Sequence, residues 1–242
     1  MTPLSECLLS LAAGPACEAC PHGVGAAAGA PFTCARRQLG PGQHLFSAGD
    51  LAREVIFVRK GALRLYWLLR DGRRRIIGFR GAGEAIIPEE GQQHRFSAQA
   101  VTAAEVRAIP LTPFHAAARS NSTVLVGLHR QLARERDAAY ELIAILGRHD
   151  AEASVAAFLL DLDDRTSSGT PGEWLQLSIL RADIADYLGL SHETVSRVLT
   201  AFRQRRLIEI ARSRQLRLLD RAVLVQIAGK GDVDRKRIGV SA

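Results

Sequence analysis

The chain has 242 residues, of which 47% are hydrophobic and 24% charged, and its net charge is +7. This length is sufficient for two ordinary domains, and the hydrophobic fraction is too high for a disordered chain. No run approaches the roughly eighteen apolar residues that a membrane-spanning helix needs. The N-terminus also lacks the basic stretch of a secretory signal. We therefore expect a cytoplasmic protein without a membrane partner.

The cysteines are confined to one end of the chain, at positions 7, 17, 20 and 34. A disulfide framework would spread them along the sequence and would need an oxidising compartment. Three alternatives remain: a metal site, a set of redox-active thiols, or no cysteine chemistry. Residues 1–36 are rich in Ala and Gly and have no sustained period. We interpret them as an arm that carries the cysteines.

Short β-type runs separated by glycines follow, and we expect strands over residues 54–58, 63–69, 76–79, 98–101 and 106–109. In the second run, apolar residues alternate onto one face of the sheet, at Leu63, Leu65, Trp67 and Leu69. The next dipeptide, Asp71-Gly72, predicts a tight hairpin of type I′. Short strands at this spacing favour a compact β-roll, which we assign to residues 37–118.

A helical period begins after Pro110, and leucines recur at steps of three and four within residues 119–148. These leucines form a seam along one side of the helix, to which we assign Leu125, Leu128, Leu132, Leu142 and Leu146. Glu135 is the one polar position in this seam. A narrow heptad seam predicts a helix that pairs with a second copy of the chain. The alternative is a helix packed along its own domain.

The last part of the chain, residues 149–242, has the spacing of a helix–turn–helix motif. The pattern predicts a helix over Arg181–Leu188, which Gly189 ends by taking a left-handed conformation. Ser191 can then cap a second helix over residues 192–205, with Thr194 three positions later. Strands are expected at residues 174–177, 207–210 and 216–218.

The second of these helices has a divided surface. Its apolar stripe, which would hold it against the first helix, is formed by Val195, Val198, Leu199 and Phe202. Glu193, Ser196 and Arg197 share the opposite face, near the end that enters the major groove in such motifs. Arg donates two hydrogen bonds to guanine, Glu accepts one from cytosine, and Ser suits either kind of base edge. The alternative is a Glu–Arg pair on a solvated helix.

Basic residues gather around this helix. Seven arginines and two glutamates lie between His192 and Arg217, a net charge of +5 that suits a polyanion. The last two predicted strands pair across residues 212–214 as a basic wing. We assign DNA contacts to His192, Arg203, Arg212 and Arg214. A second basic run, at residues 59–80, fits a solvated face as well as it fits a ligand.

The stretch RADIADYLGLSHETVSRVL, residues 181–199, resembles the DNA-binding domain of the Crp/Fnr regulators, and its E-x-x-S-R core is typical of the Fnr and FixK branches. The resemblance extends over about residues 38–228. It implies an α+β fold with an N-terminal cyclic-nucleotide-binding-like β-roll, a long dimerisation helix and a C-terminal winged helix–turn–helix. It also implies a homodimer on a two-fold TTGA-type site in double-stranded DNA. There, Arg197 would meet the G pair and Glu193 its cytosine, with Ser196 nearby. Family members contact RNA polymerase through the roll and often activate transcription.

The resemblance leaves the signal open. Members that bind cyclic nucleotides use a Gly-Glu pair and an Arg-Ser pair. Here Gly83-Glu84 reads as a turn of the roll, and His94 and Arg95 fall at the two phosphate positions. The sequence therefore argues against cyclic AMP.

Oxygen-sensing Fnr proteins hold a [4Fe–4S] cluster with three cysteines of the arm and one of the roll. Cys17 and Cys20 are similar to the first pair, whereas Gly29 and Arg107 stand at the other two positions. Cys34 and Cys7 can complete a set of four thiolates. A response to oxygen or redox state through these cysteines is one prediction. The alternative is a ligand- or haem-responsive member without cysteine chemistry.

Two other classes compete with a DNA-binding regulator. An enzyme built on the roll, such as a cupin, needs a His/Glu metal cluster, and His44 and His94 are isolated. A purely ligand-binding module has no need of the basic segment at residues 174–219. We therefore expect a regulator and not an enzyme.

Overall fold

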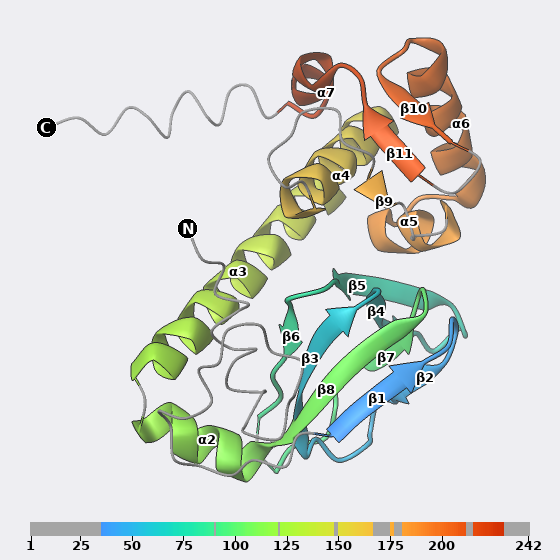
Figure 1. Ribbon diagram of the computed structural model, residues 1–242. Coiled ribbons are helices and arrows are strands. Elements are labelled where there is room, and N and C mark those ends of the chain that lie inside the picture. Colours follow the sequence, from blue (N-terminus) through green and yellow to red (C-terminus); the bar gives the residue numbers. More distant parts are fainter. Residues whose placement is uncertain are drawn as a thin grey trace, which may run out of the picture. The chain divides into compact units, whose positions relative to one another are not determined.

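The computed structural model describes residues 35–89, 91–120, 122–147, 150–166, 175–176, 181–211 and 215–229. The chain divides into two compact units, Met1–Ala138 and Ala139–Ala242 (Figure 1). The helix α3 (Ser122–Leu146) crosses the boundary between them. All four cysteines lie outside the described residues.

The first unit contains the predicted β-roll, built from two four-stranded antiparallel sheets (Figure 1). One sheet has the order β1 (Ala35–Leu39), β8 (Ala104–Pro110), β3 (Glu54–Lys60), β6 (Ala85–Ile86). The other has the order β2 (His44–Phe46), β7 (Ser97–Ala100), β4 (Leu63–Leu68), β5 (Arg74–Arg80). Every strand expected from the alternation of the sequence is present.

Two hydrophobic clusters hold the roll together. The larger lies between the sheets and combines branched side chains such as Val58 and Leu63 with small ones such as Ala98 and Ala104, which let the sheets approach. The smaller joins the outer face of the first sheet, through Phe57, to α2 (Leu111–Ser120). The helical period predicted after Pro110 is thus confirmed, and it forms two helices, α2 and α3.

The alternation in β4 does not extend as far as the sequence predicts. Leu63 and Leu65 are buried, but Trp67 and Leu69 are 47% and 40% exposed, so burial along this alternation ends at Leu65. A β-bulge lies beside this point, on the neighbouring strand: the partner of β4 jumps from Gly78 to Ile76 between Leu65 and Tyr66, so Ile77 is the extra residue of β5. The register of β4 with β7 is unbroken from Leu63 to Tyr66, so the bulge changes the facing of residues in β5 and not in β4.

The hairpin between β4 and β5 also differs from the prediction. Gly72 has a φ of +80°, but among the described residues Arg206 is the one non-glycine with positive φ, so Asp71 is not left-handed and the turn is not type I′. The Gly72 amide donates to the Leu69 carbonyl at 3.0 Å. The Asp71 carboxylate accepts hydrogen bonds from the amide and Nε of Arg73 at 3.0 and 2.7 Å. Glycine therefore supplies the left-handed residue after the two central positions.

An ion pair links the roll to the following helix inside the first unit. Arg80 of β5 is almost buried and lies 3.3 Å from Glu135 of α3. Glu135 also accepts a hydrogen bond from Gln131 at 3.1 Å. The polar residue of the predicted seam is thus engaged by the chain's own roll.

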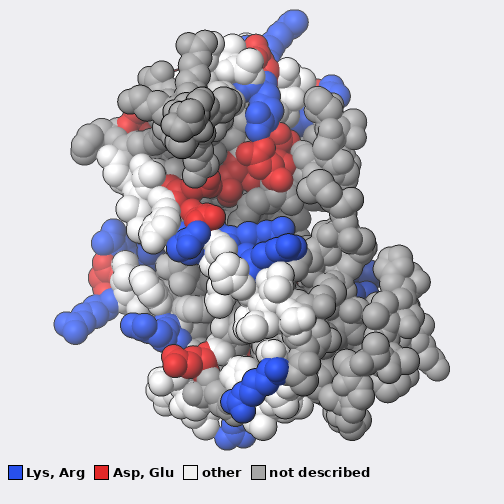
Figure 2. Space-filling view, turned by 90° about the vertical axis from the view of Figure 1, so that its left-hand side faces the viewer, with Lys and Arg blue, Asp and Glu red and all other residues white. Residues whose placement is uncertain are grey.

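The second unit is organised around α4 (Ala151–Thr166), whose residues 153–160 are all buried. This helix is a core element that contacts β9 (Leu175–Gln176), α6 (His192–Gln204) and α7 (Arg221–Ile227). Figure 2 shows acidic side chains gathered on one face of this unit, with basic ones beside them. Arg221 of α7 bonds to Asp164 of α4 at 2.5 Å. This ion pair joins α7 to α4.

Three short strands complete the second unit in the order β10 (Ile208–Ile210), β11 (Gln215–Leu218), β9 (Leu175–Gln176). The pairing of Ile208 with Leu218 confirms the predicted wing. Among the described residues, no helix has both the length and the apolar character needed to cross a bilayer.

Candidate nucleic-acid interface

The helix–turn–helix is formed by α5 (Arg181–Leu188) and α6 (His192–Gln204). Gly189 between them has a φ of +66°, which confirms the predicted left-handed stop. Ser191 has extended dihedral angles, and its hydroxyl accepts a hydrogen bond from the Thr194 amide at 3.0 Å. The cap fixes where α6 begins, and so fixes which residues stand at its exposed end.

The buried side of α6 consists of the four residues that the sequence predicts, Val195, Val198, Leu199 and Phe202. They pack on α5, where Ile184 and Leu188 are also buried. This packing leaves the opposite face of α6 exposed.

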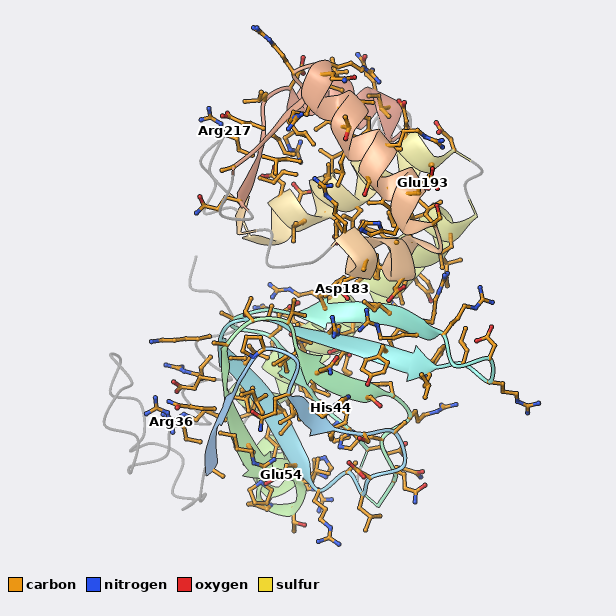
Figure 3. The ribbon with its side chains drawn as sticks, turned by 90° about the vertical axis from the view of Figure 1, so that its right-hand side faces the viewer. Arg36, His44, Glu54, Asp183, Glu193 and Arg217 are labelled. Atoms are coloured by element: carbon orange, nitrogen blue, oxygen red, sulfur yellow. The ribbon has the colours of Figure 1, made fainter. Side chains whose placement is uncertain are left out.

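Glu193 and Arg197 lie on that exposed face. Neither side chain has a hydrogen bond or ion pair within the described part of the chain, so the two do not pair with each other there. Figure 3 shows Glu193 on the outer side of α6, across the unit from Arg217. Both charged groups are therefore free to meet an external partner.

Ser196, predicted to share this face, is oriented differently. It is half-buried, and its Oγ is buried without a hydrogen-bond partner. In this rotamer the hydroxyl is not presented to solvent. One turn further on, the exposed Thr200 donates from its Oγ1 to the Ser196 carbonyl at 2.8 Å. The sequence analysis did not single out Thr200, although its spacing from Ser196 places it on the same face.

The arginines of this segment fall into two groups. Arg203 and His192 are both exposed, and neither side chain has a partner among the described residues. Arg205 instead bonds to Glu152 of α4 at 3.0 Å, and Arg217 bonds to Glu209 at 2.7 Å. The pairing of Arg217 follows from the register of the wing, in which the two residues are directly opposite. Arg212 and Arg214 lie outside the described residues.

The predicted seam of α3 is largely exposed in the single chain. Leu125 and Leu132 are 55% and 49% exposed, and Leu146 is also exposed, whereas Leu128 and Leu142 are half-buried. The sequence analysis omitted Ile143, which is exposed as well. A stripe of large apolar side chains on one helix is therefore available for a partner.

The Gly83-Glu84 pair, weighed above as part of a nucleotide site, lies in a turn of the roll. Gly83 has a φ of +86°, and the Glu84 carboxylate accepts a hydrogen bond from the Gly81 amide at 2.7 Å. This pair closes a turn, as the sequence predicts. His94 is buried and stacks on Phe46 with a ring separation of 3.6 Å. Burial lowers the pKa of His94, and the charge of Asp50 opposes that shift.

The two parts of the chain match two known families of domain. Residues 36–121 match the cyclic nucleotide-binding domain, and residues 153–227 match the Crp-like helix-turn-helix domain. The nitrogen fixation regulation protein FixK of Rhizobium meliloti is 36% identical over 180 residues, which are 74% of this chain and 80% of that protein. The chain belongs to the Crp/Fnr family of transcription regulators.

Other members of the family are similar to this chain over most of its length. The fumarate and nitrate reduction regulatory protein of Vibrio cholerae is 30% identical over 197 residues, covering 80% of this chain and 78% of that protein. The structure of FixK2 from Bradyrhizobium japonicum is similar with a TM-score of 0.74 and 32% identity, over 81% of this chain and 97% of that one. The predicted α+β fold and the helix–turn–helix regulator are thus confirmed. Proteins of this kind are regulators and not enzymes.

Proposed function

We propose that two copies of the chain pair through α3 and read a two-fold TTGA-like site in double-stranded DNA with Arg197 and Glu193. One observation carries the proposal: both side chains are exposed and unpaired on the face of α6 opposite its buried stripe. An arginine there can donate two hydrogen bonds to guanine, and a glutamate can accept one from the paired cytosine. Ser196 lies between them and takes part once its hydroxyl turns outward.

The exposed stripe of α3 supports the pairing. Leu125, Leu132 and Leu146 would each lose their contact with water in a parallel helix pair, which is the main source of stability in such a seam. A two-fold dimer would place two copies of α6 on successive half-sites. Pairing and DNA reading therefore depend on each other.

The remaining DNA contacts that we propose are the ones expected from the sequence. We assign phosphate contacts to His192 and Arg203, which are free in the described part of the chain, and to Arg212 and Arg214 of the wing. We propose residues 37–118 as the sensor roll, which also contacts RNA polymerase, 119–148 as the dimerisation helix and 149–242 as the DNA-binding domain.

An iron–sulfur cluster with a ligand from the roll does not fit this chain. Arg107 occupies the position of that ligand in β8, with its Nε buried, no hydrogen-bond partner, and Glu105 at 3.9 Å. The sequence from residue 35 onward contains no cysteine, so the roll has no thiolate to offer. Any response to oxygen or redox state would rest on Cys7, Cys17, Cys20 and Cys34 of the arm alone.

The proposal is tested by substituting Arg197. In Arg197→Ala, we expect specific binding to fall by about 1–3 kcal/mol and discrimination at the G position to be lost, while weak salt-dependent binding persists. The matched control is Arg205→Ala, because Arg205 is already engaged by Glu152. Binding to TTGA-containing and substituted duplexes at two salt concentrations gives the measurement. If Arg197→Ala keeps full discrimination, the recognition assignment is wrong.

A further inference from the structure

The roll contains a cavity of about 420 Å³ that the DNA-reading function does not use. It opens where β3 begins and β8 ends, an end of the roll marked by Glu54 in Figure 3. Leu45, Phe46 and Ile56 form an apolar wall that belongs to, or packs against, the core between the sheets. A cavity of this size with an apolar wall and a few polar groups is typical of a small-molecule site.

Two of the lining side chains lack a polar partner. His94 is only 9% exposed, and its imidazole has no hydrogen bond within the described part of the chain, although its ring stacks on Phe46. Arg53 is exposed at the mouth, and its guanidinium likewise has no partner among the described residues. The nitrogens of His94 are not among the fully buried unpaired atoms of the described residues, so they remain accessible to a ligand in the cavity.

The other charged groups of the cavity balance one another. Arg37 donates to both carboxylate oxygens of Glu54, at 2.8 and 2.6 Å, so this pair contributes no net charge. Asp50 accepts a hydrogen bond from the Ser47 amide at 2.7 Å and offsets the charge of Arg53. Burial lowers the pKa of His94 and so favours its neutral form at neutral pH. The lining is therefore neutral overall, which disfavours a ligand with several negative charges.

We propose that this cavity binds a small monocarboxylate with a compact apolar body. The carboxylate would pair with Arg53 and accept a hydrogen bond from His94, while the body packs on Leu45, Phe46 and Ile56. Of the residues weighed above as a cyclic-nucleotide site, the cavity includes His94 but not Gly83, Glu84 or Arg95, so the two sets of residues overlap at one position only. Binding here does not require DNA, so its test is independent of the proposed DNA reading.

The test uses 4-fluorobenzoate as the probe, followed by fluorine NMR with the full chain and without DNA. We expect a Kd of about 1 mM or tighter, which is typical of a good fragment-sized ligand. The neutral analogue 4-fluorobenzamide should bind at least about tenfold more weakly, because it has no negative charge with which to form an ion pair with a guanidinium.

Variants locate the site. Arg53→Gln should weaken 4-fluorobenzoate binding by about tenfold or more. The control Arg70→Gln removes an equally exposed arginine of the roll that does not line the cavity, and should leave binding unchanged. His94→Phe keeps a ring to stack on Phe46 and should weaken binding by a smaller factor. Unfolding curves of each variant show that the fold is intact.

Three results would overturn the proposal: no binding at about 10 mM probe, equal binding by the amide, or binding that Arg53→Gln leaves unchanged. Displacement of the probe by inorganic phosphate at a lower concentration than by benzoate would contradict the assigned ligand class.

Discussion

The Thr194 amide lies 3.0 Å from the Ser191 hydroxyl oxygen, and their two hydroxyl oxygens are 2.8 Å apart, so one side chain begins the helix that carries Glu193 and Arg197. Removing the hydroxyl in Ser191→Ala should lower the free energy of unfolding by about 1 kcal/mol. It should also weaken DNA binding, because the first turn of α6 frays. Thermal unfolding and duplex binding measure the two effects. Ser191→Asp is the control, since its carboxylate can replace the cap and should retain stability.

A second prediction concerns the buried hydroxyl of Ser196. Because its Oγ has no hydrogen-bond partner, Ser196→Ala should leave stability unchanged or raise it by up to about 1 kcal/mol. Specific DNA binding should fall less than in Arg197→Ala. Urea unfolding and binding to the TTGA duplex are the measurements. An equal loss of specific binding in the two variants would contradict the smaller contribution assigned here to the Ser196 hydroxyl.

The exposed stripe of α3 predicts an effect on assembly. Leu132→Asp places a charge in the proposed seam and should convert the dimer to a monomer in sedimentation experiments, with loss of binding to the two-fold site. Val126 is a matched control, because it is similarly exposed but lies about 120° around the helix from Leu132. Val126→Asp should remain dimeric. Monomers in both variants, or in neither, would contradict the seam.

His94 predicts a pH dependence of stability. Burial lowers its pKa from 6.5, and the charge of Asp50 opposes the shift. As the pH falls below about 6.5, the unfolded chain therefore takes up a proton more readily than the folded one, and the free energy of unfolding decreases. The urea midpoint of the native chain relative to His94→Phe should thus drop between about pH 7.5 and about pH 5.5. A difference that stays constant over this range would exclude His94 as the source.

Sequence reasoning succeeds here where a feature depends on residues that are close together in the chain. Gly189 and Ser191 each act on the backbone within a few residues, and the helix ends they predict are the ones observed. The buried stripe of α6 follows from a simple period, because one side packs and the other is exposed. The buried and the exposed face of α6 can therefore both be predicted from the sequence.

Sequence reasoning fails where a feature depends on a neighbouring strand or on the choice of a side-chain rotamer. The bulge in β5 opposite Leu65 and Tyr66 depends on how the two strands pair, and no pattern in either strand alone contains that information. The orientation of the Ser196 hydroxyl is a choice of side-chain rotamer that spacing cannot specify. The burial of α4 does not follow from the sequence pattern, because a helix packed on most sides has no polar face to reveal its period.

The end of burial along β4 has a practical consequence for measuring what the roll does. Trp67 lies beyond the buried part of the strand, so its indole is half in water, with its Nε1 bonded to the Arg95 carbonyl at 2.9 Å. Arg95 directly follows His94, so a ligand that shifts this segment would alter the surroundings of the indole. The chain has one other tryptophan, Trp174. In a Trp174→Phe background, the emission of Trp67 becomes a built-in optical reporter of occupancy in the roll.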